Sequence, residues 1–186
     1  MGLNSNGVET DKPLRWQCCR TSPHDRQSVS IHPLALVSSE SKLGNGVTVS
    51  AFATIEAGVT IGDHCSVGSG SVIKTGVTIG DHNEICEHAV IGGQPQHTAR
   101  PETVGTIVIG NHNVFREGVS IHRALKPDGQ TTVGNNNYLM AGAHLGHDTH
   151  LGNKCIFANN SLAGGHVVIE DYAFVSGAVA IHQFCR

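Results

Sequence analysis

The 186-residue sequence predicts an all-β fold, a parallel β-helix built from six-residue repeats. Three observations predict it: an apolar residue recurs at every sixth position, glycine often follows that residue, and aromatic residues make up only 4% of the chain. A period of six does not fit the period of about 3.6 residues of an amphipathic helix. Short β-branched strands joined by tight turns accommodate it, and we expect the glycines to permit those turns.

The repeat begins at Ile31 and is interrupted twice. Steps of six residues reach an apolar side chain every time up to Ile91, and the steps resume in phase at Ile109. The apolar positions after it are Phe115, Ile121, Val133, Leu139, Leu145, Leu151, Phe157, Ala163, Ile169, Val175 and Ile181. Positions 97, 103 and 127 break the series, so each interruption contains a whole multiple of six residues. We therefore expect residues 31–186 to form one β-helix domain.

Three segments depart from the repeat. Residues 1–30 contain prolines and the single tryptophan, and we expect an irregular N-terminal extension there. Residues 92–106 and 122–132 are polar and rich in turn-forming residues, which predicts loops extruded from the coil wall, where binding residues tend to collect. The chain ends five residues after the last apolar position. Because such an end exposes unpaired strand edges, we expect the β-helix to be truncated at its C-terminus.

Composition excludes several classes of protein. The net charge of −3 and the lack of a basic stripe argue against binding to nucleic acid. No apolar run is long enough for a membrane span, and the N-terminus lacks the layout of a signal peptide. The six cysteines form no C-x-x-C pair. Cys65 and Cys155 fall on a repeat position that takes small residues, so we expect buried free thiols, a reducing compartment and a cytoplasmic protein.

A six-residue repeat of this kind resembles that of the hexapeptide-repeat proteins. The resemblance implies three six-residue sides per triangular coil, hence 18 residues per coil, and a left-handed wind, although the usual crossover rule would predict the opposite hand. Neighbouring strands of a sheet lie about 4.8 Å apart. Residues 18 apart in the sequence are therefore expected to stack on one another.

This stacking places titratable side chains against glycine near the C-terminus. Three adjacent columns result: His147 with Gly165 and Gln183; Asp148 with His166; and Gly146 with Gly164 and His182. An imidazole can remove a proton from a hydroxyl near neutral pH, and an adjacent carboxylate can fix its tautomer. A glycine N–H one coil away can bind a developing oxyanion. No serine or cysteine nucleophile lies in these columns, which favours general-base catalysis by direct transfer.

The histidines also allow a metal interpretation. His144, His147 and His150 lie close in the sequence, and neutral imidazoles are common zinc ligands. A spacing of three residues spreads them over different parts of the coil wall, so one chain does not easily bring all three together. A trimer interface can combine ligands from two chains, as in the γ-class carbonic anhydrases, which share this solenoid. A purely structural, non-catalytic solenoid is the remaining alternative.

A series of short motifs resembles the UDP-N-acetylglucosamine acyltransferase family of lipid A biosynthesis over residues 31–186. The motifs are I-H-R at 121–123, A-H-L-G-H-D at 143–148, A-N-N at 158–160, A-G-G-H at 163–166 and H-Q-F-C at 182–185. The resemblance implies a cytoplasmic homotrimer without a cofactor, a structural metal or stable membrane insertion. It implies transfer of a 3-hydroxyacyl group from acyl carrier protein to the 3-hydroxyl of UDP-N-acetylglucosamine.

The resemblance also implies roles for individual residues. His147 is expected to be the general base, Asp148 its orienting partner and Gly165 the N–H donor to the oxyanion. The expected substrate contacts are Gln96, His122, His144, His166, His182 and Gln183.

Two features depart from the family pattern. The family's first loop reads Q-D-L-K-Y, whereas residues 96–100 here read Q-H-T-A-R. The acidic residue that contacts the sugar and the lysine that faces the acyl donor are thus replaced. The family also continues past H-Q-F-C into a helical C-terminal domain. A related acyltransferase that uses another nucleotide sugar, or an amine acceptor, is therefore an alternative.

Overall fold

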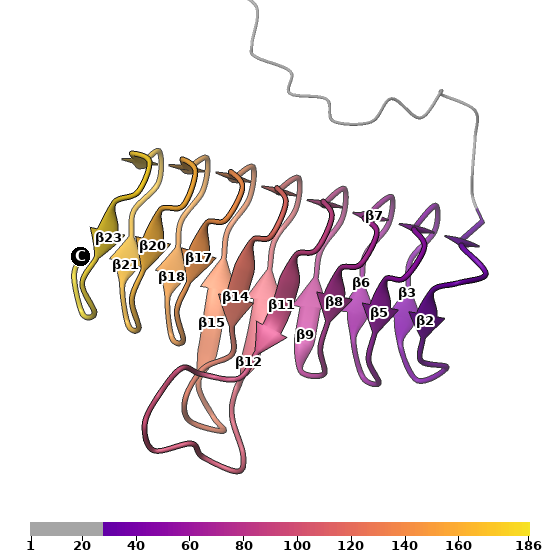
Figure 1. The fold of residues 1–186 in the computed structure, drawn as a ribbon, viewed down its shortest axis with the longest axis horizontal. Coiled ribbons are helices and arrows are strands. Elements are labelled where there is room, and N and C mark those ends of the chain that lie inside the picture. The colour runs from indigo at the N-terminus through magenta and orange to yellow at the C-terminus, as the bar shows by residue number, and fades with distance from the viewer. Residues whose placement is uncertain (1–27) are drawn as a thin grey trace, which may run out of the picture.

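The computed structural model describes residues 28–186, so the extension predicted for residues 1–30 lies outside the described residues except for its last three. The described residues form 23 short strands and no helix, wound into a left-handed parallel β-helix, which confirms the predicted fold (Figure 1). None of the described residues lies in a helix that could cross a membrane. Figure 1 shows the coils side by side along the long axis, with one excursion hanging from the middle of the solenoid.

The strands form three parallel sheets, one for each side of the coil. The first sheet contains β1 (Ser30–Ile31), β4 (Thr48–Val49), β7 (Ser66–Val67), β10 (Glu84–Ile85), β13 (Val114–Phe115), β16 (Tyr138–Leu139), β19 (Ile156–Phe157) and β22 (Phe174–Val175). The second contains β2 (Leu36–Val37), β5 (Thr54–Ile55), β8 (Val72–Ile73), β11 (Val90–Gly93), β14 (Ser120–His122), β17 (His144–Leu145), β20 (Leu162–Ala163) and β23 (Ala180–Ile181). The third contains β3 (Lys42–Leu43), β6 (Thr60–Ile61), β9 (Val77–Ile79), β12 (Thr106–Ile109), β15 (Gln130–Val133), β18 (His150–Leu151) and β21 (Val168–Ile169).

The register of the sheets confirms the coil of 18 residues. Val72 pairs with Val90, and His144 pairs with Leu162. Across the first interruption the offset rises to 30, as between Glu84 and Val114. Across the second it is 24, as between Ser120 and His144. The two interruptions therefore add twelve and six residues, and the phase of the repeat survives both.

The apolar positions of the repeat point inward and form a single column-like core. In most strands the core residue is buried while the residue before it faces outward, as the alternation of a strand requires. Phe115 and Phe157 are the largest fully buried side chains. Cys65 and Cys155 are buried free thiols, as predicted.

Most of the glycines that follow the core position serve close packing between coils, which corrects the expectation that they permit turns. A Cβ atom at Gly146 would lie 2.8 Å from the Gly164 carbonyl carbon, and one at Gly62 would overlap the Asp81 carboxylate. Among the glycines that follow a core position, only Gly92 has a positive φ, of 98°. The left-handed conformation falls two residues later instead, often on histidine, as at His64.

Hydrogen-bonded side chains tie the coils together at the end of the third sheet. There the backbone N–H of one residue donates to the Oδ1 atom of the Asp or Asn one coil further on, at 2.7 to 2.8 Å. The ladder runs through Asn45, Asp63, Asp81, Asn111, Asn135, Asn153 and Asp171. Inside the coil, Asn83, Asn113 and Asn137 form a second, buried ladder. These amides satisfy backbone groups that no strand pairs.

Both excursions leave the coil from the end of the second sheet and return to the third. Their loops are shorter than the predicted ranges 92–106 and 122–132, because residues at both ends of each predicted loop pair into the sheets. Gly93 pairs with His122, and β12 pairs with β15 from Thr106 and Gln130 onward. The segments outside strands are residues 94–105 and 123–129.

We predict that Phe115→Ala lowers the free energy of unfolding by about 3–5 kcal/mol, because it leaves a cavity in a core that the coil geometry cannot close. The matched control is Phe174→Ala, since Phe174 occupies the outer face of the same sheet with 64% of its surface exposed. We expect a change within about 0.5 kcal/mol for that variant. Urea denaturation of both variants measures the difference, and equal losses would contradict the assigned core.

Candidate active site

Titratable side chains gather at the corner that follows strands β14, β17 and β20. His147 lies two residues after the end of β17, and only 8% of its surface is exposed. Asp148 follows it with a φ of 59°, a left-handed conformation that turns the chain toward the third sheet. The second excursion passes beside Asp148, because the Leu125 N–H donates to its Oδ2 atom. The corner therefore combines a rigid coil with a loop.

Asp148 fixes the orientation and the tautomer of His147. The Nδ1 atom of His147 lies 2.7 Å from Oδ2 of Asp148. A carboxylate only accepts hydrogen bonds, so Nδ1 carries the proton and Nε2 is left as an acceptor. The carboxylate is itself held, because the Leu125 N–H donates to Oδ2 at 2.9 Å and the Asp148 N–H donates to Thr131 Oγ1 at 2.8 Å.

Gly165 stacks on the His147 ring, as the coil periodicity predicts. A Cβ atom at Gly165 would lie 2.6 Å from both Cε1 and Nε2 of His147, so only glycine leaves room for the ring. The coils are joined here by the His166 N–H, which donates to the His147 carbonyl at 2.9 Å. Within residues 28–186, the N–H of Gly165 donates to no protein acceptor. It is thus available to a ligand.

His166 lies in the column next to His147, also as predicted. Its Nε2 atom is 3.8 Å from Oδ2 of Asp148. Its ring meets the His147 ring edge-on, with centroids 5.1 Å apart at 89°. The Phe184 ring stacks on the other side at 4.7 Å and 7°. We call His147, Asp148 and His166 the His–Asp–His cluster.

His122 and His144 form a second pair of imidazoles on the outer face of the second sheet. Their rings meet edge-on with centroids 4.7 Å apart, and Ser120 Oγ lies 2.8 Å from Nδ1 of His144. Burial, together with the charges of His144 and His147, lowers the pKa of His122 from 6.5 to about 4. Burial also lowers the pKa of His144. Both rings are therefore neutral at pH 7.

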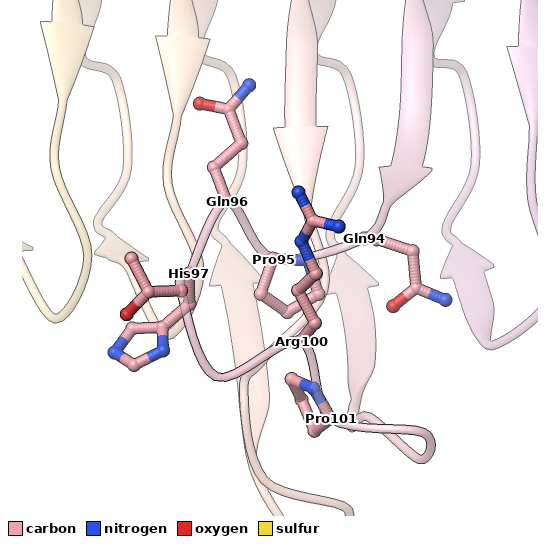
Figure 2. A pocket seen from close by; sticks show the side chains of 7 residues that line it. Gln94, Pro95, Gln96, His97, Arg100 and Pro101 are labelled. Carbon is pink, nitrogen blue, oxygen red and sulfur yellow. The ribbon is translucent and has the colours of Figure 1, made fainter.

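The remaining predicted residues lie at the edge of this corner. His182 and Gln183 are exposed on the last coil, and Nδ1 of His182 lies 3.1 Å from the Gln183 carbonyl oxygen. Gln96 is exposed on the first excursion. Figure 2 shows the hollow inside this loop, which Gln96 lines together with Gln94, Pro95, His97, Thr98, Arg100 and Pro101. The roles of these residues as substrate contacts stay predictions.

Sequence reasoning missed His97 as a neighbour of the site. Its ring meets the His147 ring edge-on with centroids 5.9 Å apart, so the first excursion reaches back to the corner that holds His147. The Ala99 N–H donates to Nδ1 of His97 at 3.1 Å, which places the ring proton on Nε2. In Figure 2 the side chains of His97 and Gln94 point to opposite sides of the loop. No sequence period fixes the path of such a loop.

The metal interpretation based on three nearby histidines does not describe this corner. His144 lies on the second sheet, whereas His150 lies on β18 of the third sheet, where its Nδ1 is 2.8 Å from Thr132 Oγ1. The spacing of three residues spreads these rings over the coil wall, as expected. At this corner, the atoms that come close enough to share an ion belong to the His–Asp–His cluster instead.

Comparisons with known proteins agree with the fold. The model of the bacterial transferase hexapeptide family, described as six repeats, matches residues 40–75, 58–93 and 130–165. The acyl-[acyl-carrier-protein]–UDP-N-acetylglucosamine O-acyltransferase of Stenotrophomonas maltophilia is 50% identical over 157 residues, which are 84% of this chain and 60% of that protein. The same-named protein of Pseudomonas putida is 49% identical over 158 residues, covering 84% and 61%. The chain thus spans about 60% of the length of these curated relatives.

Solved structures give the same result. The UDP-N-acetylglucosamine acyltransferase from Campylobacter jejuni superposes with a TM-score of 0.79 at 36% identity, over 83% of this chain and 61% of that one. The UDP-N-acetylglucosamine acyltransferase from Bacteroides fragilis superposes with a TM-score of 0.80 at 40% identity, over 83% and 61%.

The lowered pKa of His122 predicts acid destabilisation. Between pH 6.5 and about pH 4 the unfolded chain binds a proton at His122 that the folded chain does not, so the free energy of unfolding falls as the pH falls. At pH 5 this residue accounts for a loss of about 2 kcal/mol relative to pH 7.5. In His122→Gln, urea denaturation should show a loss smaller by that amount. Identical losses in both proteins would contradict the neutral, buried imidazole.

Proposed function

Since this chain is a hexapeptide-repeat β-helix that resembles the UDP-N-acetylglucosamine O-acyltransferases over 84% of its length, we propose that it transfers a 3-hydroxyacyl group from acyl carrier protein to the 3-hydroxyl of UDP-N-acetylglucosamine. One observation carries the proposal: Asp148 holds His147 with Nε2 as a free acceptor, and Gly165, which lies against that ring, has an N–H that donates to no acceptor within residues 28–186. This is the arrangement that acyl transfer to a hydroxyl requires.

The reaction proceeds by direct transfer. Nε2 of His147 removes the proton of the sugar 3-hydroxyl as the hydroxyl oxygen attacks the thioester carbonyl carbon. The new C–O bond gives a tetrahedral oxyanion, which the Gly165 N–H stabilises. Collapse breaks the C–S bond, and the imidazolium returns its proton to the departing thiolate. Asp148 stabilises the imidazolium throughout, because Oδ2 lies 2.7 Å from Nδ1.

Neutral neighbours support the same chemistry. The buried His122 ring and the half-buried His144 ring add no positive charge at pH 7, so they present hydrogen-bonding groups to a nucleotide sugar without opposing the imidazolium of His147. His182, Gln183 and Gln96 are exposed and therefore accessible to a substrate. We propose these side chains as substrate contacts. The homotrimer and the cytoplasmic location are part of the proposal, supported by the resemblance and by the free thiols of residues 28–186.

A second candidate acceptor is the 3-amino analogue of the nucleotide sugar, with amide formation. The specific observation is His97, which stands where the family's first loop carries an acidic residue and which lies against the His147 ring. Replacing a carboxylate by an imidazole changes which sugar substituents find a hydrogen-bond partner. Assaying UDP-N-acetylglucosamine and its 3-amino analogue in parallel distinguishes the two acceptors, and a preference for the amine would reject the ester-forming function.

We predict that His147→Ala lowers the rate of acyl transfer at least about 100-fold, because it removes the general base. The measurement is transfer of a 3-hydroxyacyl group from acyl carrier protein to UDP-N-acetylglucosamine. Absence of transfer by the unsubstituted chain, or near-normal turnover by the variant, would contradict the proposal.

Gly165→Ala provides a matched test in which the His147 side chain is still present but is pushed out of position. Its methyl group would stand 2.6 Å from Nε2 of His147 and displace the ring. We expect a similar loss of transfer. Gly177→Ala is the control, since a Cβ atom there meets nothing closer than 3.4 Å.

A further inference from the structure

The His–Asp–His cluster brings three potential metal ligands together from two successive coils. The candidate ligand atoms of His147, Asp148 and His166 all lie within 4.8 Å of one another. Oδ2 of Asp148 is the central atom, 2.7 Å from Nδ1 of His147 and 3.8 Å from Nε2 of His166. Two imidazole nitrogens and one carboxylate oxygen form a donor set that suits late first-row divalent ions.

Two of the three spacings between these atoms lie close to those that such an ion requires. Zinc binds nitrogen and oxygen at about 2.0–2.2 Å, so two ligands of a tetrahedral ion stand roughly 3.3 Å apart. The two distances in the cluster lie on either side of that value. The side chains of His147 and Asp148 are 10% and 14% exposed, whereas that of His166 is 38% exposed. One side of the cluster is therefore open to an incoming ion.

The surroundings hold the ligands in place. Backbone and hydroxyl contacts from Leu125 and Thr131 fix Asp148, and the stacked Phe184 ring restrains His166. Partners of this kind orient ligands and raise metal affinity. His97 is not counted as a ligand, because it is not among the residues whose ligand atoms come within 4.8 Å of one another.

We propose that His147, Asp148 and His166 bind a single zinc ion. The ion coordinates Nδ1 of His147 and replaces the proton that this atom shares with Asp148. The ring proton then moves to Nε2, so the nitrogen that accepts a proton in the proposed reaction becomes a donor. Zinc in this site therefore blocks the general base, and no residue of the protein is oxidised and no covalent bond of the chain is broken. This consequence for catalysis rests on the proposed function, whereas zinc binding itself does not.

Titration calorimetry with zinc chloride at pH 7.5 tests the site in the absence of substrate. The unsubstituted chain should bind one zinc ion per chain at this site, and cobalt(II) in the same site should give a visible absorption band. His166→Gln and Asp148→Asn should each weaken binding at least about tenfold, since loss of an outer-shell partner alone has an effect of that size. His150→Gln is the matched control, because His150 is an exposed ring outside the cluster.

Equal affinity in all four proteins would overturn the proposal, because it would assign the binding to scattered surface histidines. Two different variants are used so that misfolding of one of them cannot by itself explain a loss of zinc binding. Circular dichroism tests whether each variant retains the β-helix. Acyl transfer with and without zinc is measured separately. If zinc binds but transfer is unaffected, the result counts against His147 as the base. If both variants bind zinc as tightly as the unsubstituted chain, the result counts against the metal site and leaves the proposed function untouched.

Discussion

The stacking of each coil on the next, at the strand spacing of about 4.8 Å, is the constraint on which the rest of the structure depends. Backbone pairing enforces it along three sheets, and most of the glycines after the core positions allow it at the corners. At Gly146, a side chain would collide with the backbone of Gly164 in the following coil. The Asp and Asn ladder at the end of the third sheet then satisfies N–H groups that the sheets leave unpaired. Close approach and hydrogen bonding thus repeat together once in each coil.

The same constraint builds the site. Because one coil rests directly on another, Gly165 lies against the face of His147 and His166 lies beside Asp148. The excursions add twelve and six residues without disturbing this register, since each is a whole number of repeats. The coil can therefore carry loops that reach back over the corner. The second loop secures the Asp148 carboxylate through the Leu125 N–H, and the first brings His97 to the His147 ring.

Much of this arrangement follows from the sequence, because a strict period converts sequence distance into spatial distance. The core positions, the phase across both interruptions and the column of His147 with Gly165 all depend only on counting. Hydrogen bonds between non-equivalent atoms cannot be predicted by counting residues. The buried ladder through Asn113 was missed because an amide is normally disfavoured at a buried position. The position of His97 was missed because its loop has no repeat, and the glycines were assigned to turns because composition does not separate close packing from positive φ.

The account depends most directly on the tautomer of His147, because a proton on Nδ1 leaves Nε2 free to act as the base. Nitrogen-15 chemical shifts of the imidazole measure it at neutral pH, with His147→Gln identifying the signals. The structure predicts a protonated Nδ1 that donates to Asp148 and an unprotonated Nε2. Asp148→Asn should alter the balance between the two nitrogens. A proton found on Nε2 of His147 in the free protein would contradict the account.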